Sequence, residues 1–262
     1  MPIAPINGIE MYYEIHGSGQ PIVFSHGRGG NHFSWWQQLA DFSRDYKCIT
    51  FDHRGWGLTS DVTNGPGTKA FSDDLESLLD YLEIEKTALV SQSMGGITNL
   101  NFTLKSPHRV SALVLGDTTG GIGDSSVVDL LEDVHPPEHP LGRALSAHFM
   151  ENNPAKTTLF QQIGFLNPPM PISVVSPLFR NPDGPKKVEL SAMITPTLLV
   201  VGREDLIFPP HVMEAATKLI PNATLEIVAN AAHSTHFELS LIHISEPTRR
   251  TPISYAVFCL KK

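Results

Sequence analysis

A chain of 262 residues, 41% of them hydrophobic, is long enough for one large α/β domain with its own core. Its formal net charge of -8 comes without any run of Lys or Arg. This argues against nucleic acid or an anionic membrane as partner, and we expect a small-molecule substrate and a monomer or homodimer. The N-terminus lacks a basic, apolar leader, so we expect a cytoplasmic protein, and Cys48 and Cys259 predict neither a disulfide nor a metal cluster.

Seven short apolar or β-branched runs, bounded by turn residues, predict strands. They are residues 9–15, 21–24, 48–51, 88–90, 112–115, 197–201 and 225–228. Leucines at three- and four-residue spacing predict a helix over residues 72–82, between two of these strands. Alternation of this kind indicates an α/β fold with a doubly wound, mostly parallel sheet that helices cover on both faces.

A serine-centred turn follows the predicted strand at residues 88–90 and leads into a helical run. A serine at a sharp strand-to-helix turn adopts strained backbone angles, so the residues two before and two after it must be small. Ser91 and Gly95 meet this requirement for Ser93, whereas Leu89 would not meet it for Ser91. The local sequence therefore predicts Ser93 as a nucleophile.

Residues 120–193 break the alternation of strands and helices. The segment is rich in proline and holds two helical patches, at about residues 141–150 and 155–166, but no strand pattern. We expect a helical lid at 120–193, inserted into one core domain formed by residues 1–119 and 194–238.

The last 24 residues change character from Leu239 onward, since no amphipathic period fits them. Back-translation of LSLIHISEPTR matches a common transposase-type sequencing adapter, and ISYAVFCLKK resembles a flow-cell primer followed by lysine codons. We interpret residues 239–262 as a non-native tail and exclude them from the fold.

Five motifs in this order resemble the α/β-hydrolase family, over about residues 9–238. The motifs are His26-Gly27-Arg28-Gly29-Gly30, Asp52-His53-Arg54-Gly55, Ser91-Gln92-Ser93-Met94-Gly95, and the two loops that contain Asp205 and His233. Ser91 and Ala232 stand where the family more often has Gly. We interpret the turn that begins at Asp52 as structural, because an Arg with an Asp near two glycines most often fixes a loop by charge-assisted hydrogen bonds.

The same resemblance implies a catalytic triad in which Ser93 is the nucleophile, His233 the general base and Asp205 the acid that orients the histidine. Glu204 and Asp117 remain alternatives for the acid. The backbone N–H groups of Arg28 and Met94 are the expected donors of an oxyanion hole, which would stabilise the charge of a tetrahedral intermediate.

A serine at the turn disfavours the related dehalogenases and epoxide hydrolases, which use Asp there. The family resemblance therefore implies a serine hydrolase that cleaves a carboxylic ester or lactone through an acyl-enzyme, without a metal or other cofactor. Alternatives are a carbon–carbon bond hydrolase of meta-cleavage type, a cofactor-free perhydrolase and a small-molecule receptor. A meta-cleavage substrate would need an arginine for its carboxylate, and the candidates are Arg28, Arg143 and Arg180.

The expected substrate contacts are His32, Trp35, Phe149 and Phe160.

Overall fold

The computed structural model describes residues 2–169 and 171–239, and the structural statements below refer to these residues. The predicted non-native tail lies outside them except for Leu239.

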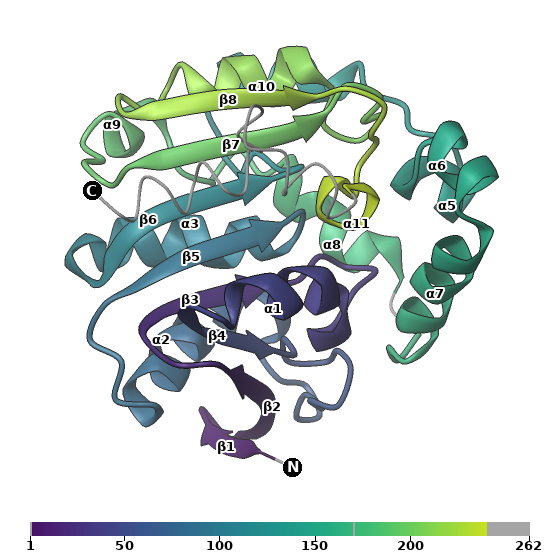
Figure 1. The fold of residues 1–262 in the computed structure, drawn as a ribbon. Coiled ribbons are helices and arrows are strands. Elements are labelled where there is room, and N and C mark those ends of the chain that lie inside the picture. The colour runs from purple at the N-terminus through teal and green to yellow at the C-terminus, as the bar shows by residue number, and fades with distance from the viewer. Residues whose placement is uncertain (1, 170, 240–262) are drawn as a thin grey trace.

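Eight strands form a single sheet in the order β1-β2-β4-β3-β5-β6-β7-β8 (Figure 1). The strands are β1 (Ile3–Ile6), β2 (Ile9–His16), β3 (Gln20–Ser25), β4 (Tyr46–Phe51), β5 (Thr87–Gln92), β6 (Val110–Gly116), β7 (Thr197–Gly202) and β8 (Ala223–Val228). Strand β2 pairs antiparallel with β1 and β4, and all pairs from β4 to β8 are parallel. The predicted α/β class with a mostly parallel sheet is confirmed. Strand β1 was not expected, because Pro5 interrupts a run of only four residues.

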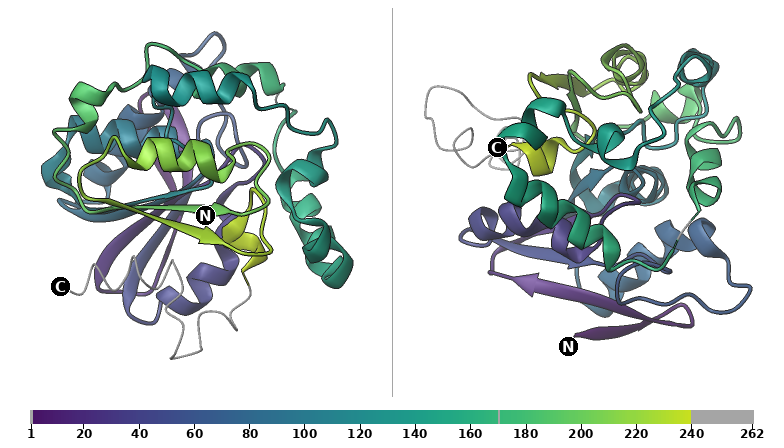
Figure 2. Two further views of the ribbon diagram at one scale, coloured as in Figure 1. Left: turned by 90° about the horizontal axis from the view of Figure 1, so that it is seen from above. Right: turned by 90° about the vertical axis from the view of Figure 1, so that its right-hand side faces the viewer.

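Helices cover both faces of this sheet (Figures 1 and 2). They are α1 (Trp36–Phe42), α2 (Phe71–Tyr81), α3 (Gly95–Lys105), α4 (Ser125–Glu132), α5 (Pro140–Ala144), α6 (Ala147–Asn152), α7 (Pro154–Phe165), α8 (Ile172–Phe179), α9 (Lys187–Leu190), α10 (Pro210–Thr217) and α11 (Thr235–Glu238), with 3-10 helices η1 (His32–Trp35), η2 (Gly67–Ala70) and η3 (Pro107–Arg109). Buried strand residues alternate between two core layers, as the twofold period of a strand requires. In β3, Ile22 and Phe24 face the layer that contains α1, whereas Val23 faces the layer built with α2, α3, α4 and α10.

Helices α4 to α9 all lie between β6 and β7, where the sequence predicts an insertion. The first and last of them belong to the core, since Val127 and Leu131 of α4 and Leu190 of α9 are buried in the same cluster as α10. Helices α5, α6 and α7 stand apart, beyond the carboxyl ends of the parallel strands (Figures 1 and 2). In open α/β sheets ligands bind at this edge, so these helices lie over the expected position of a site.

Candidate active site

Ser93 occupies a strained turn between β5 and α3. Its φ is +49°, in the left-handed region that costs a non-glycine residue energy. A Cβ added to Gly95 would overlap the backbone carbonyl of Ser25, so a larger residue cannot follow the turn here. Ser91 lies within the sheet, where its hydroxyl donates to the carbonyl of Val114 at 2.8 Å. The geometry agrees with the choice of Ser93 over Ser91.

Three side chains from distant parts of the chain meet at this turn. The hydroxyl of Ser93 lies 2.9 Å from Nε2 of His233, and Nδ1 of His233 lies 2.9 Å from Oδ2 of Asp205. Because an ionised carboxylate only accepts hydrogen bonds, Nδ1 carries the proton and Nε2 can accept one from the serine. The other Asp205 oxygen accepts from the backbone N–H of Ile207 at 2.7 Å and of Phe208 at 3.0 Å, which holds the carboxylate in place. The structure thus brings the predicted nucleophile, base and acid into hydrogen-bonding contact.

Neither alternative acid contacts the imidazole. Glu204 is exposed to solvent. Asp117, at the end of β6, is fully buried and accepts hydrogen bonds from the N–H and hydroxyl of Thr235, at 3.0 and 2.8 Å. Burial, with the charge of Asp205 beside it, raises the pKa of Asp117 to about 7. Asp117 therefore anchors the loop after His233.

Electrostatics at His233 favour its protonated form. Burial by itself would lower the pKa of His233, but the charge and hydrogen bond of Asp205, with the nearby Asp117 and Glu238, outweigh it and raise the pKa above 6.5. Glu238 also joins two segments: its carboxylate accepts from the N–H of Ala232 at 2.9 Å and from the hydroxyl of Ser146, at the start of α6, at 2.5 Å. Burial raises the pKa of Glu238 to about 7. The imidazole of His233 thus lies near three buried acidic groups, Asp205, Asp117 and Glu238, whose charge raises its pKa.

The loop after β3 lies directly against the serine turn. A Cβ built on Gly27 would come within 3.1 Å of the Ser93 Cβ, so the backbone at Gly27, just before Arg28, passes beside Ser93. The indole N–H of Trp56 donates to the carbonyl of Arg28 at 2.8 Å and holds this loop. Met94 precedes the first turn of α3, where backbone N–H groups have no partner within the helix. Met94 follows Ser93 directly, and Gly27, the neighbour of Arg28, lies against it, so the predicted oxyanion donors stay a prediction that this backbone arrangement allows.

A cavity of about 870 Å³ opens at Ser93 and His233. This volume suits a small organic ligand. Its walls come from the loop at residues 28–30, from α5, α7 and α8, and from the segment after Asp205. Phe160 lines it as predicted, and Phe179 and Phe208 are apolar lining residues that the sequence reading missed. Within the described ranges, no group of three or more His, Cys, Asp or Glu is placed to hold a metal ion.

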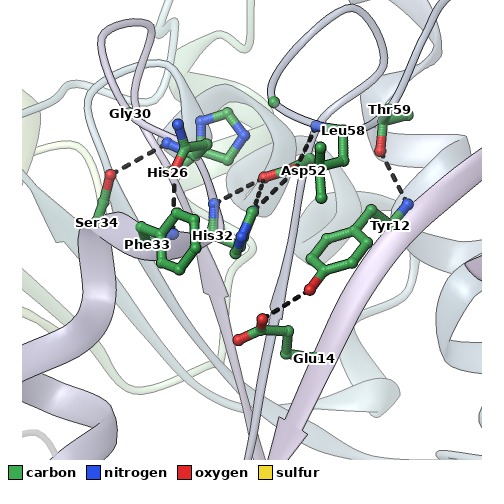
Figure 3. A network of polar contacts seen from close by, with 12 residues as sticks. Tyr12, Glu14, His26, Gly30, His32, Phe33, Ser34, Asp52, Leu58 and Thr59 are labelled. Atoms are coloured by element: carbon green, nitrogen blue, oxygen red, sulfur yellow. Dashed lines mark hydrogen bonds and ion pairs between the residues drawn. The ribbon is translucent and has the colours of Figure 1, made fainter. Parts of the chain in front are cut away.

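Three of the four predicted substrate contacts do not line this cavity, which corrects that prediction. His32 turns toward Asp52, with Nδ1 2.9 Å from both carboxylate oxygens (Figure 3). Trp35 is buried between Phe24 and His236. Local sequence could not reveal this, because aromatic residues near a site fill the core as readily as the pocket.

Phe149 is the third of these residues. It lies in α6 and packs on Phe237.

The turn after β4 is structural, as the sequence indicated. Asp52 also accepts from the N–H of Leu58 at 2.8 Å, and Arg54 pairs with Asp74.

Several known proteins with related sequences or structures are named as hydrolases, and others are named as non-heme haloperoxidases. A protein assigned as the carbamate hydrolase RutD of Rhizobium rhizogenes is 27% identical over 214 residues, which cover 76% of this chain and 81% of that protein. The 2-hydroxy-6-oxononadienedioate/2-hydroxy-6-oxononatrienedioate hydrolase of Paraburkholderia xenovorans is 27% identical over 256 residues, covering 88% and 86%. A thermophilic esterase from Thermogutta terrifontis, solved with malate bound, superposes on this chain with a TM-score of 0.75 at 25% sequence identity. The superposition covers 91% of this chain and 93% of the esterase chain.

The sequence profile of the alpha/beta hydrolase fold matches residues 20–143 and 139–239, which is most of the chain. No helix among the described residues is both long and apolar enough to cross a membrane. The profile, the parallel sheet and the serine turn at the carboxyl end of β5 agree with one another. This chain is therefore a hydrolase that belongs to the α/β-hydrolase fold family.

Proposed function

We propose that the protein hydrolyses a carboxylic ester or lactone of a small, largely apolar substrate through an acyl-enzyme at Ser93. The supporting observation is the position of His233, whose two ring nitrogens each lie 2.9 Å from an oxygen, one of Ser93 and one of Asp205. A serine hydroxyl is a weak nucleophile until a base removes its proton, and a base needs a fixed tautomer to do so.

In the proposed reaction, Nε2 of His233 takes the proton of the Ser93 hydroxyl while the oxygen attacks the substrate carbonyl. The N–H groups of Arg28 and Met94 bind the resulting oxyanion, a contribution that typically lowers a barrier by about 3 kcal/mol for each donor. His233 then returns the proton to the leaving alcohol. Water, activated by the same imidazole, releases the acid and restores Ser93.

The relatives support acyl transfer without selecting one bond. Their names describe a carbamate hydrolase, a hydrolase of 2-hydroxy-6-oxononadienedioate and an esterase, and each of these substrates contains a carbonyl group. Ester or lactone cleavage needs no polar leaving-group machinery beyond His233, and apolar residues such as Phe160, Phe179 and Phe208 line much of the cavity. These features favour an ester bond.

A fluorophosphonate probe tests the nucleophile directly. We expect an adduct on Ser93, found by peptide mass spectrometry, and hydrolysis of p-nitrophenyl butyrate that disappears in Ser93→Ala. Ser91→Ala is the matched control, because Ser91 is a buried neighbour with a structural hydrogen bond. A folded protein with no adduct on Ser93 would refute the proposal and favour a receptor.

A further inference from the structure

Asn167, which follows the inserted helix α7, joins three segments of the chain. Its side-chain N–H donates to the carbonyl of Gly30 at 3.1 Å. Its side-chain oxygen accepts from the N–H of Gly57 at 3.1 Å and from Nδ2 of Asn31 at 3.2 Å. Because an amide has separate donor and acceptor ends, these partners fix one orientation of the side chain. The end of α7 is therefore bonded to the loop after β3 and to the turn after β4.

Asn31 makes the same connection from the side of the loop. Its Nδ2 also donates to the carbonyl of Ile163, in the last turn of α7, at 2.8 Å. The two backbones approach each other here as well, since a Cβ added to Gly164 would lie 3.4 Å from the carbonyl oxygen of Gly29. Together, the hydrogen bonds of Asn31 and Asn167 form a joint between α7 and the loop after β3, named the α7 joint below.

The loop at this joint carries one of the two predicted oxyanion donors. The N–H of Gly30 donates to the carbonyl of Gly27 at 3.0 Å. A trans peptide unit is planar, so the direction of the Gly27 carbonyl sets the opposite direction for the N–H of Arg28 in the same unit. Asn167 holds the carbonyl of Gly30. One residue and one backbone hydrogen bond thus connect Asn167 to the peptide unit of the predicted donor.

This loop has few side chains that could hold it in place. Three of the four residues from 27 to 30 are glycine, the residue with the widest conformational freedom. The indole of Trp56 holds the carbonyl of Arg28, and the amide of Asn167 holds that of Gly30. Contacts from outside the loop therefore supply the order that the glycines lack.

Helix α7 is itself anchored, so its end has a fixed position. Ile163 belongs to a buried apolar cluster with Phe149 of α6 and Phe237 of α11. At the start of α6, the N–H and the hydroxyl of Ser146 donate to the carboxylate of Glu238, at 3.1 and 2.5 Å. The helix pair α6–α7 is thus attached to α11 at one end and to the loop after β3 at the other.

We propose that Asn167 is a positioning residue for the oxyanion hole, because it fixes the direction of the Arg28 N–H through Gly30. This inference rests on the proposed function at Ser93. An oxyanion donor is effective only when it is preorganised, and a displacement of about 1 Å can lower a rate by about a hundredfold. Loss of the α7 joint therefore slows both formation and hydrolysis of the acyl-enzyme, since each step passes through a tetrahedral intermediate.

Removal of the Asn167 side chain separates positioning from direct contact with substrate. Asn167 lines the cavity, so we choose p-nitrophenyl acetate, whose acyl chain is too short to extend along the wall. We expect Asn167→Ala to lower kcat about tenfold or more and to leave KM within about twofold of wild type. Asn152→Ala is the matched control, because Asn152 is exposed on α6 and its amide bonds only to His148 among the described residues. This control should retain the wild-type kcat.

Asn31→Ser breaks the α7 joint from the other side. The serine can still accept the N–H of Phe33 and cap η1, as Asn31 does at 3.1 Å, but it is too short to reach Ile163. We expect kcat to fall as in Asn167→Ala. The double variant should be no slower than the slower single variant, because both changes remove the same joint, and additive losses would refute it. If circular dichroism shows that Asn167→Ala does not fold, the result for Asn31→Ser decides.

Amide hydrogen exchange observes the loop without any reaction. In a peptide that covers residues 27–31, exchange should be about tenfold faster in Asn167→Ala and unchanged in Asn152→Ala. Unchanged exchange or unchanged kcat in a folded variant overturns the proposal. A raised KM at unchanged kcat also overturns it, because Asn167 would then be a substrate contact. If wild type neither hydrolyses the ester nor labels at Ser93, the proposed function is wrong, and exchange alone decides whether Asn167 orders the loop.

Discussion

At the scale of single residues, the proposed reactivity of Ser93 depends on how the buried groups behind it are protonated. Asp205 is placed to hold the His233 ring with its Nε2 toward the serine. Asp117 and Glu238 add negative potential from behind the same ring. The tautomer of the His233 ring thus depends on Asp205, and its charge depends on Asp205, Asp117 and Glu238 together.

Replacement of Asp205 tests the orienting role. Asp205→Asn keeps the volume of the side chain but stabilises the wrong tautomer of His233. We expect kcat to fall by about four orders of magnitude. Ester hydrolysis measured beside far-ultraviolet circular dichroism checks this, and Glu204→Gln, at the exposed neighbour, should retain wild-type activity. A fall of less than tenfold in Asp205→Asn would show that another group orients the base.

The acidic limb of the pH profile tests His233 as the proposed base. The base must be neutral to act, so activity falls as pH drops through its pKa, and a raised pKa moves that loss to higher pH. As pH falls, we expect kcat/KM to reach half of its maximum at a pH above 6.5. Asp117→Asn removes a nearby carboxylate and should shift the limb to lower pH, whereas Asp80→Asn, 62% exposed on the surface, should not. An unchanged limb in Asp117→Asn would exclude its influence.

At the scale of elements, the site is a consequence of how β5, α3 and the loop after β3 approach one another. The serine turn can pass beside residues 25–27 only because Gly27 and Gly95 carry no side chain. Helix α3 then begins at Gly95, and the N–H groups of Gly96 and Ile97 donate to the carbonyls of Ser93 and Met94, which closes the turn. Small residues at these positions are therefore a condition of the geometry.

Gly95→Ala tests this close approach. The new methyl group would overlap the rigid Ser25 carbonyl, and we expect a loss of roughly 1–3 kcal/mol in the free energy of unfolding, with slower fluorophosphonate labelling. Gly142→Ala in α5 is the matched control, because its Cβ would enter open space. This change should stabilise by about 0.5–1 kcal/mol through helix propensity. Urea unfolding measures both variants, and equal effects would contradict the packing argument.

At the scale of the whole molecule, buried histidines couple stability to pH. Burial lowers the pKa of His26 and His53, and burial with the charge of His233 lowers that of His236 to about 3. Below pH 6.5 these histidines take up protons when the protein unfolds. The free energy of unfolding therefore decreases as pH falls from 6.5 toward their pKa in the folded state. Asp117 and Glu238 act in the opposite direction, since their raised pKa values favour the folded state as pH falls below about 7.

The contribution of His236 can be measured by comparing how the stability of wild type and of a His236 variant depends on pH. His236→Phe preserves an aromatic ring against Trp35, 4.8 Å away in the native protein, and removes the titration. Between pH 7.5 and pH 5 we expect wild type to lose about 2 kcal/mol more stability than the variant. Chemical denaturation at the two pH values measures this, and parallel losses would show that His236 titrates normally.

The local sequence predicted those features that depend on neighbouring residues. Short apolar or β-branched runs bounded by turn residues predicted seven of the eight strands, and small residues on both sides of Ser93 selected it over Ser91. Family resemblance, rather than local pattern, pointed to Asp205 and His233. Strand β1 was not predicted from the sequence, because it is short and contains Pro5. Its pairing with β2 is seen only in the folded chain.

Tertiary structure alone decided which side chains face the cavity and in what charge state. His32, Trp35 and Phe149 pack into the interior, whereas Arg143, remote in sequence from Ser93, reaches the cavity wall. Asp117 and Glu238 acquire raised pKa values only when burial removes their water. The physical reason is that periodicity and turn chemistry act over a few residues, while burial and electrostatic potential sum over groups that only the folded chain brings together.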